Sequence, residues 1–430
     1  MSSKTNPTAT QDEAKLSLVP GKRFPEFRKH GQWKFVPLRD LAERGKTKNR
    51  DEKIERVLTN SAEFGVVDQR DFFDKDIATQ GKLESYVVVE LGDYVYNPRI
   101  SATAPVGPIS KNQIGTGVMS PLYTVFRFKN PENSFYQHYF KTTGWHTYMR
   151  QASSTGARHD RMAIGSDDFM AMPLPVAPAP EEQQKIAACL DSVDELIAAQ
   201  ARKVDALKNQ KKGLMQQLFP REGETQPCLR FPEFENAGEW EVRLIGDMFD
   251  LINGCAFKPE DWKPTGTPII RIQNLNDPSA EFNYSQEPVP ERNRVEPGEL
   301  LFAWSGTLGS SFGARIWNGP SGVLNQHIFK VLMNEKEITL RFALLVLAKV
   351  EEEIARRTHG FKASFVHVKK SDLVQVAMLL PSVPEQERIA SCLSSLDAQI
   401  TAETQKLEAL KTHKKGLMQQ LFPSQEAVEA

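Results

Sequence analysis

Lys211-Lys212-Gly213-Leu214-Met215-Gln216-Gln217-Leu218-Phe219-Pro220 occurs twice in the chain, the second time as residues 414–423. The identity extends upstream of this stretch. Residues 186–220 and 389–423 align without a gap at an offset of 203, and 22 of the 35 positions are identical. A repeat of this length indicates an internal duplication.

The duplication also includes shorter segments elsewhere. The pattern Pro-x-x-Arg-Phe-Pro-Glu-Phe occurs at residues 20–27 and again at 227–234, and it leads to Trp33 in the first copy and to Trp240 in the second. The 430 residues are therefore predicted to form two halves. Each half is a divergent globular segment of roughly 150 residues followed by a much more similar helix.

Both repeated segments carry the alternating four-residue and three-residue spacing of a coiled-coil seam. Polar residues interrupt the apolar series at the same two places in each copy. The seam positions are Ile186, Leu190, Val193, Ile197, Gln200, Val204, Leu207, Lys211, Leu214 and Leu218, and then Ile389, Leu393, Leu396, Ile400, Glu403, Leu407, Leu410, Lys414, Leu417 and Leu421.

Each seam predicts a helix of about 35 residues and about 50 Å. The two helices are either separate surface helices or a packed pair. If a two-fold axis relates the halves, the pair is antiparallel, and Gln200 and Glu403 lie in adjacent layers near its middle. Gly213 and Gly416 each cost about 1 kcal/mol relative to alanine in a helix interior. Close packing by a partner and a plain helix bend explain these glycines equally well.

The composition is that of an ordinary soluble protein, with 40% hydrophobic and 25% charged residues and a formal net charge of −1. No apolar run approaches the ~18 residues needed to span a bilayer, and the polar residues 1–20 do not resemble a signal peptide, so we expect a cytoplasmic protein. The four cysteines lack metal-ligand spacing, so no metal site is expected. Phosphate-loop, dinucleotide and methyltransferase motifs are absent, and no catalytic residue is predicted.

The divergent segments combine strand and helix patterns. Residues 84–96, 122–128, 300–304 and 327–332 are rich in β-branched and aromatic residues and predict strands, whereas residues 340–357 predict a helix. The fold class is therefore α+β.

Polar loop residues are the candidate DNA contacts, because Arg, Asn and Gln read base edges while Lys, Ser and Thr reach phosphates. A solvated loop explains any single one of them equally well. The recurrence of such loops at matching places in both halves supports the group. The candidates are Asn97, Arg99, Lys111, Arg158 and Arg161 in the first half and Arg271, Gln273, Asn274, Ser305, Thr307, Asn325, Gln326 and Lys362 in the second.

With its duplicated exit motif and its Glu-Gln helix entries at Glu182-Gln183 and Glu385-Gln386, the chain resembles the specificity subunit of type I restriction-modification enzymes. The proline of the first entry is one residue out of step with that of the second. The resemblance implies two mixed α/β target-recognition domains separated by an antiparallel pair of long coiled-coil helices. It divides the chain into a polar tail (1–20), recognition domain 1 (21–172), spacer helix 1 (173–222), recognition domain 2 (223–376), spacer helix 2 (377–424) and a C-terminal tail (425–430).

The resemblance also implies the partners. Each recognition domain would read one half of a bipartite site on double-stranded DNA, and two modification (methyltransferase) subunits would dock on the helices, with restriction subunits joining them. S-adenosylmethionine, ATP and Mg²⁺ would belong to those subunits, so this chain would be a non-catalytic component that binds no cofactor itself. The alternative is a coiled-coil scaffold for protein interactions that does not read DNA.

Overall fold

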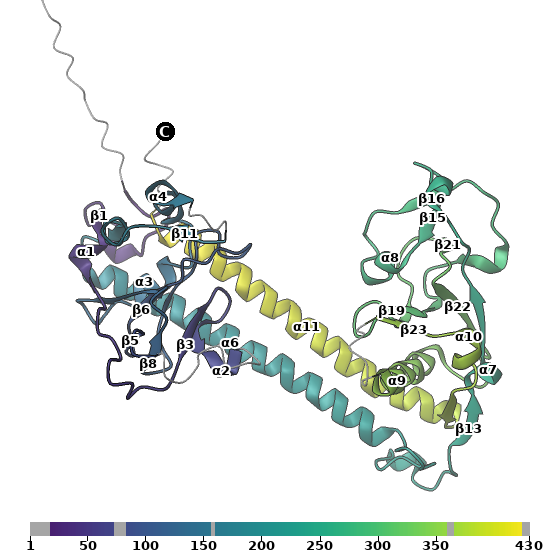
Figure 1. Ribbon diagram of the computed structural model, residues 1–430. Helices are drawn as coiled ribbons and strands as arrows, with labels where there is room; N and C mark the ends of the chain where they lie inside the picture. The colour runs from purple at the N-terminus through teal and green to yellow at the C-terminus, as the bar shows by residue number, and fades with distance from the viewer. Residues whose placement is uncertain (1–17, 73–82, 156–159, 359–364, 424–430) are drawn as a thin grey trace, which may run out of the picture. The chain divides into compact units, whose positions relative to one another are not determined.

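The structure is a computed structural model that describes residues 18–72, 83–155, 160–358 and 365–423, and the chain divides into two compact units. Unit 1 comprises residues 1–201 and 405–430, and unit 2 comprises residues 202–404. The fold combines helices with sheets, as the sequence predicts. Two 39-residue helices, α6 (Pro180–Leu218) and α11 (Val383–Leu421), each contribute one part to each unit (Figure 1).

The main sheet of unit 1 is antiparallel and has the strand order β2-β9-β6-β7. Its strands are β2 (Ala42–Arg44), β9 (Thr124–Phe128), β6 (Tyr94–Tyr96) and β7 (Ile109–Lys111). Four two-stranded sheets accompany it: β1 (Lys34–Pro37) with β12 (Pro173–Val176), β3 (Leu58–Ser61) with β4 (Gly65–Asp68), β5 (Val87–Val89) with β8 (Gly117–Met119), and β10 (Ser154–Thr155) with β11 (Met162–Ala163).

Short helices connect these strands: η1 (Pro25–Phe27), α1 (Leu38–Leu41), α2 (Gln69–Phe72), α3 (Ser134–Tyr139), α4 (His146–Ala152) and α5 (Ser166–Met170). The core of unit 1 is aromatic, and both long helices enter it. Leu190 of α6 and Leu421 of α11 pack in the same cluster as Trp33 and Tyr94. The globular part of unit 1 is thereby anchored to both helices.

Unit 2 has a corresponding antiparallel sheet with the order β14-β22-β18-β20. Its strands are β14 (Phe249–Asn253), β22 (Ile328–Met333), β18 (Leu300–Ala303) and β20 (Gly313–Ile316). A second sheet has the order β16-β15-β21-β17, formed by β16 (Asn283–Ser285), β15 (Thr267–Ile270), β21 (Gly322–Leu324) and β17 (Arg294–Val295). The two-stranded sheets are β13 (Glu241–Leu244) with β24 (Ala377–Leu380) and β19 (Ser305–Thr307) with β23 (Phe365–His367).

The helices of unit 2 are η2 (Pro232–Phe234), α7 (Ile245–Met248), η3 (Pro259–Asp261), α8 (Ile272–Asn276), η4 (Glu291–Asn293), α9 (Leu340–Thr358) and α10 (Lys370–Leu373). Their core again takes in the ends of both long helices. Leu218 and Phe219, at the end of α6, pack in one cluster with Ile389 and Leu393 of α11.

Most of the predicted elements are present, but residues 84–96 do not form one strand. The chain turns at Gly92, where φ is +90°, and this turn separates β5 from β6, which belong to different sheets. A positive φ suits glycine because it lacks a Cβ atom. The predicted helix at residues 340–357 corresponds to α9.

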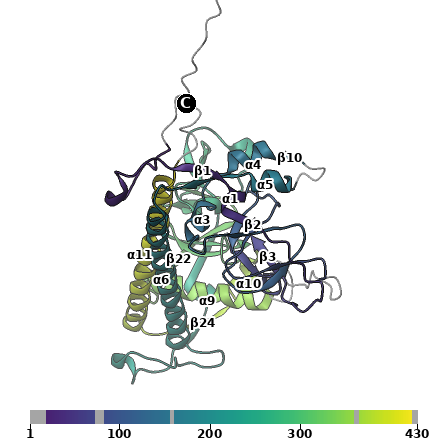
Figure 2. The same ribbon diagram turned by 90° about the vertical axis from the view of Figure 1, so that its left-hand side faces the viewer.

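Within each unit, the two long helices make ion pairs with each other. In unit 1, Lys414 Nζ lies 2.5 Å from Asp194 Oδ1, and the first part of α6 runs beside the last part of α11 in both views (Figure 1 and Figure 2). In unit 2, Lys211 Nζ lies 2.6 Å from Asp397 Oδ1. The lysines that interrupt the seam are therefore paired with aspartates of the other helix. Each of the other 18 seam residues is buried or half-buried.

Candidate functional site

In unit 1 the structure brings three candidate residues together at the end of β6. The Asn97 side chain donates to the carbonyl oxygen of Asn60 at 2.9 Å and accepts from the backbone N–H of Arg99 at 3.0 Å. Arg99 forms a β-bridge with Arg161. Both guanidinium groups approach Asp160, at 4.0 Å and 3.8 Å. Because the Arg99 side chain is 59% exposed, this cluster presents a cationic edge to solvent.

Lys111 belongs to a different environment. It pairs with Tyr94 in the β6–β7 ladder, and its ammonium lies 5.9 Å from the centre of the Tyr94 ring. Burial lowers the pKa of Lys111, and the charge of Asp191 opposes that shift. The structure therefore does not bring Lys111 into the Asn97 cluster. Arg158 lies outside the described residues.

In unit 2, Arg271, Gln273 and Asn274 surround the start of α8. The Arg271 guanidinium stacks over the Trp262 ring at 4.8 Å and donates to Asn283 Oδ1 at 2.8 Å. Asn274 is fully buried, and its side chain accepts from the backbone N–H of Arg271 and donates to the carbonyl oxygen of Ala280, both at 3.1 Å. Asn274 thus holds the loop that presents Arg271.

Gln273 is also held by this loop, because its side-chain amide donates to the carbonyl oxygen of Glu281 at 3.2 Å. Ser305 and Thr307 lie in β19, opposite His367 and Phe365 of β23, and Ser305 is only 5% exposed. The carbonyl oxygen of Thr307 accepts backbone N–H groups from the following tight turn. Lys362 lies outside the described residues.

Asn325 and Gln326 begin the turn before β22. Asn325 donates its backbone N–H to the carbonyl oxygen of Ile270 at 3.0 Å, and its side chain accepts the backbone N–H of Gln326 at 2.6 Å. Three neighbouring buried atoms have no hydrogen-bond partner among the described residues: Gln326 Oε1, His327 Nδ1 and Trp304 Nε1. The Trp304 ring centre lies 5.3 Å from that of His327. Buried polar atoms are nearly always paired, so these three atoms are exceptions within the described residues.

One buried ion pair holds each globular segment to a long helix. The sequence patterns did not reveal these two ion pairs. Arg23 contacts both carboxylate oxygens of Glu182 at 2.5 and 2.6 Å, and Arg230 contacts those of Glu385 at 2.8 and 2.7 Å. Glu182 and Glu385 are 0% and 1% exposed. They occupy equivalent positions at the 203-residue offset, although the entry prolines are one residue out of step. We call each arginine–glutamate pair a clasp.

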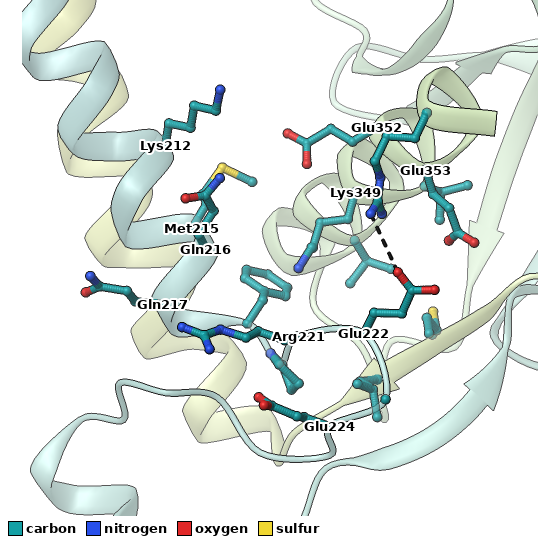
Figure 3. Close-up of a pocket in the computed structure, with 18 of the residues that line it drawn as sticks. Lys212, Met215, Gln216, Gln217, Arg221, Glu222, Glu224, Lys349, Glu352 and Glu353 are labelled. Carbon is teal, nitrogen blue, oxygen red and sulfur yellow. Dashed lines mark ion pairs between the residues drawn. The ribbon is translucent and has the colours of Figure 1, made fainter. Parts of the chain in front are cut away.

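The first copy of the repeated motif lines a groove of about 1220 Å³ within unit 2 (Figure 3). Eight of its ten residues contribute, together with the loop at residues 221–225, α9 and the β13–β24 pair. Lys349 of α9 lies 4.8 Å from the centre of the Phe219 ring, and burial lowers its pKa. Gly213 also lines the groove, and no atom lies within 4 Å of the place where its Cβ would be. The groove therefore combines apolar walls with charged edges, as protein-docking surfaces do.

No helix in the described ranges is long and apolar enough to cross a membrane. In the same part of the chain, no group of three or more His, Cys, Asp and Glu side chains is arranged to hold a metal ion.

Comparison with known proteins agrees with these features. Residues 237–412 match the family model of the type I restriction modification DNA specificity domain. The chain is 23% identical over 287 residues to the type I restriction enzyme MjaVIII specificity subunit of Methanocaldococcus jannaschii, covering 63% of this chain and 65% of that protein. It is 25% identical over 275 residues to the putative MjaX specificity subunit of the same organism, covering 61% of each protein. The chain thus spans less than two thirds of either relative.

The fold is also similar to a solved structure. The crystal structure of the type I restriction-modification S subunit from M. genitalium matches with a TM-score of 0.56 and 14% identity, over 94% of this chain and 99% of that one. The two structures share sheet-bearing segments joined to two long helices, so the likeness is one of fold. Residues 237–412 therefore carry a type I restriction modification DNA specificity domain, and the chain is similar to type I restriction enzyme specificity subunits.

Proposed function

We propose that the chain is the non-catalytic DNA sequence-specificity subunit of a type I restriction-modification complex. The DNA specificity domain at residues 237–412 is the observation that carries this proposal. Residues 21–172 and 223–376 would be the two target-recognition domains, and each would read one half of a bipartite site on double-stranded DNA. The complex would act in the cytoplasm, where such DNA is accessible.

The proposed architecture is an internal duplication with pseudo-two-fold symmetry, in which α6 and α11 form an antiparallel coiled coil. Two equivalent ion pairs support it: Lys414–Asp194 joins the last part of α11 to the first part of α6, and Lys211–Asp397 joins the last part of α6 to the first part of α11. One chain with two unlike domains suits an asymmetric target, whereas a homodimer suits a palindrome. A 39-residue helix is about 58 Å long, or roughly 1.7 turns of DNA, and would set the spacing between half-sites.

The Asn97–Arg99–Arg161 cluster and the Arg271 and Asn325–Gln326 loops are the proposed DNA-reading residues. Arg99 is exposed, and Arg271 is held in place by Trp262 and Asn283. Arginine and amide side chains can contact base edges with two hydrogen bonds. Lys111, Ser305, Thr307, Gln273 and Asn274, together with Arg158 and Lys362, remain candidates with supporting or phosphate-contacting roles.

Exchange of residues 23–172 for the equivalent domain of another specificity subunit tests the proposal. We expect the reassembled complex to change only one half of its recognised sequence, because the other domain is unaltered. Selection from random duplex pools, followed by sequencing, measures the outcome. A change in both halves or in neither would refute two-domain reading, and a complex that enriches no sequence would favour the protein-interaction scaffold instead.

We further propose that two modification subunits dock on the repeated motifs, one on each copy, and that restriction subunits join them. S-adenosylmethionine, ATP and Mg²⁺ would be bound by those partners. Because the motif occurs twice in the chain, it offers the same docking surface to each of two identical modification subunits. The space beside Gly213 and Gly416, where no atom lies within 4 Å of the place that a Cβ atom would occupy, supports close approach of a partner backbone.

Gly213→Ala is expected to raise the free energy of unfolding by about 1 kcal/mol, because alanine is the better helix former and its methyl group has open space. Gly213→Leu is expected to weaken binding of the modification subunit at least tenfold, because it fills the groove. Chemical denaturation and titration with the purified modification subunit measure the two effects. Ala206→Leu, at an exposed position of α6 outside the groove, is the control. Equal binding by Gly213→Leu and the unaltered chain would contradict docking at this motif.

A further inference from the structure

Unit 1 contains an exposed run of cationic residues that lies outside the repeated sequence segments. Arg44, Lys46, Lys48 and Arg50 occupy every second position of one segment, and all four are exposed. We call them the basic stripe. It begins at the end of β2 and crosses from the main sheet to the edge of β5.

Backbone hydrogen bonds hold this segment extended. The N–H of Gly45 donates to Val125, the carbonyl oxygen of Thr47 accepts from Val88, and the N–H of Asn49 donates to Tyr86, at 2.8, 2.8 and 3.0 Å. In an extended chain, alternate residues project to the same side and lie about 6.6 Å apart. The four charges therefore span about 20 Å along a fixed backbone.

The end of the stripe is fixed by side chains. Asn49 is 2% exposed, and its amide group both donates to and accepts from the backbone of Ile54, at 2.9 and 3.2 Å. Glu52, at a φ of +48°, accepts the backbone N–H groups of Leu83 and Glu84. The turn after Arg50 is thus held at several points.

The charges of the stripe are not neutralised by its neighbours. Arg44 donates to the Ser166 hydroxyl, and within the described residues Lys46, Lys48 and Arg50 have no ion-pair partner. The two acids that follow Arg50 are engaged elsewhere: Asp51 pairs with Lys53 at 2.6 Å, and the Glu52 carboxylate accepts the backbone N–H groups of Leu83 and Glu84. Unpaired cations at regular spacing on a fixed backbone can each contact one charge of a polyanion whose charges are also regularly spaced.

We propose that the basic stripe binds the phosphate backbone of the DNA duplex, an inference that rests on the proposed DNA-reading function. DNA carries closely spaced phosphates along each strand, so each of the four charges of the stripe can contact one phosphate of the backbone. Contacts of this kind position a protein without reading sequence. The matching segment of unit 2, residues 251–257, contains no cation, so domain 1 supplies this contact alone.

The test replaces three stripe residues in the full-length chain, co-purified with its modification partner: Lys46→Gln, Lys48→Gln and Arg50→Gln together. The affinity for a duplex without a recognised site is measured against salt concentration. Because each phosphate contact contributes about 0.9 to the slope of log affinity against log salt, we expect the slope to fall by about 2.7. The sequence preference should not change.

Arg28→Gln, Lys29→Gln and Lys34→Gln together form the control, since these exposed cations of the same unit remove the same charge from another segment. The proposal that the stripe binds DNA phosphates is rejected if the salt slope of the stripe variant is unchanged, or if the slope of the control variant falls by the same amount. If the triple variant folds poorly, Lys46→Gln alone should lower the slope by about 0.9. Sequence selectivity of the unaltered complex tests the proposed function separately. If the unaltered complex is selective but the stripe variant keeps the full salt slope, only the stripe proposal is rejected. If the unaltered complex binds no duplex at all, both proposals are rejected.

Discussion

Arg230→Ala is expected to lower the free energy of unfolding of unit 2 by about 3–5 kcal/mol, the usual cost of removing one partner from a buried ion pair. The Glu385 carboxylate is 1% exposed, and two of its close contacts are the Arg230 nitrogens at 2.8 and 2.7 Å. Alanine would leave that charge buried, and within the described residues its remaining side-chain hydrogen bond would come from Trp240 Nε1 at 3.4 Å. It would also remove the hydrogen bond to the carbonyl oxygen of Ala237.

Urea denaturation followed by tryptophan fluorescence measures this loss, and hydrogen-exchange mass spectrometry assigns the transition to unit 2. Arg388→Ala is the matched control. Arg388 pairs with Glu233 at 2.9 Å, but both side chains are 48% exposed, so the expected cost is only about 0–1 kcal/mol. Arg230→Met combined with Glu385→Leu should recover most of the stability, because no buried charge then remains unpaired. Equal costs for Arg230→Ala and Arg388→Ala would contradict the clasp.

The clasp illustrates what the sequence could and could not predict. The repeat of Arg-Phe-Pro-Glu-Phe was visible, and so were the glutamates at the helix entries. Their pairing was not predictable, because Arg23 and Glu182 lie 159 residues apart and only tertiary packing brings them together. The same holds for the seam lysines. Their polar character was evident from the spacing, but the aspartate partners Asp194 and Asp397 lie on the other helix.

The long helices were predictable because a periodic apolar pattern over many turns is a strong local signal. The candidate DNA contacts rest on residue type and on the recurrence of their loops in both halves, and neither determines where a side chain points. Asn274 bonds backbone groups of its own loop, whereas Arg99 projects into solvent. The basic stripe differs from these loops in being confined to the first half. Its period of two is clear in the sequence, but it has no counterpart in the second half, so the duplication does not single it out.

Gly254→Ala is expected to destabilise unit 2 by about 3 kcal/mol and to impair reading of the half-site assigned to domain 2. A Cβ atom on Gly254 would lie 2.0 Å from the carbonyl oxygen of Asn325 and 2.7 Å from that of Leu324. These are backbone atoms, so relief requires the strand and the turn to shift. The turn carries Asn325 and Gln326, and Gly254 itself donates its N–H to the carbonyl oxygen of Ile328 at 3.0 Å.

Gly238→Ala is the control, because this exposed glycine has no atom within 4 Å of the added methyl group and should be near neutral. Urea titration gives the stability of both variants. Selection from random duplex pools, at a temperature where the Gly254→Ala chain is still folded, gives the recognised sequence. Since the Asn97–Arg99 cluster belongs to unit 1, we expect the half-site read by domain 1 to be enriched as before and the other half to lose its preference. Retention of both halves by a folded Gly254→Ala chain would show that the Asn325 turn does not read DNA.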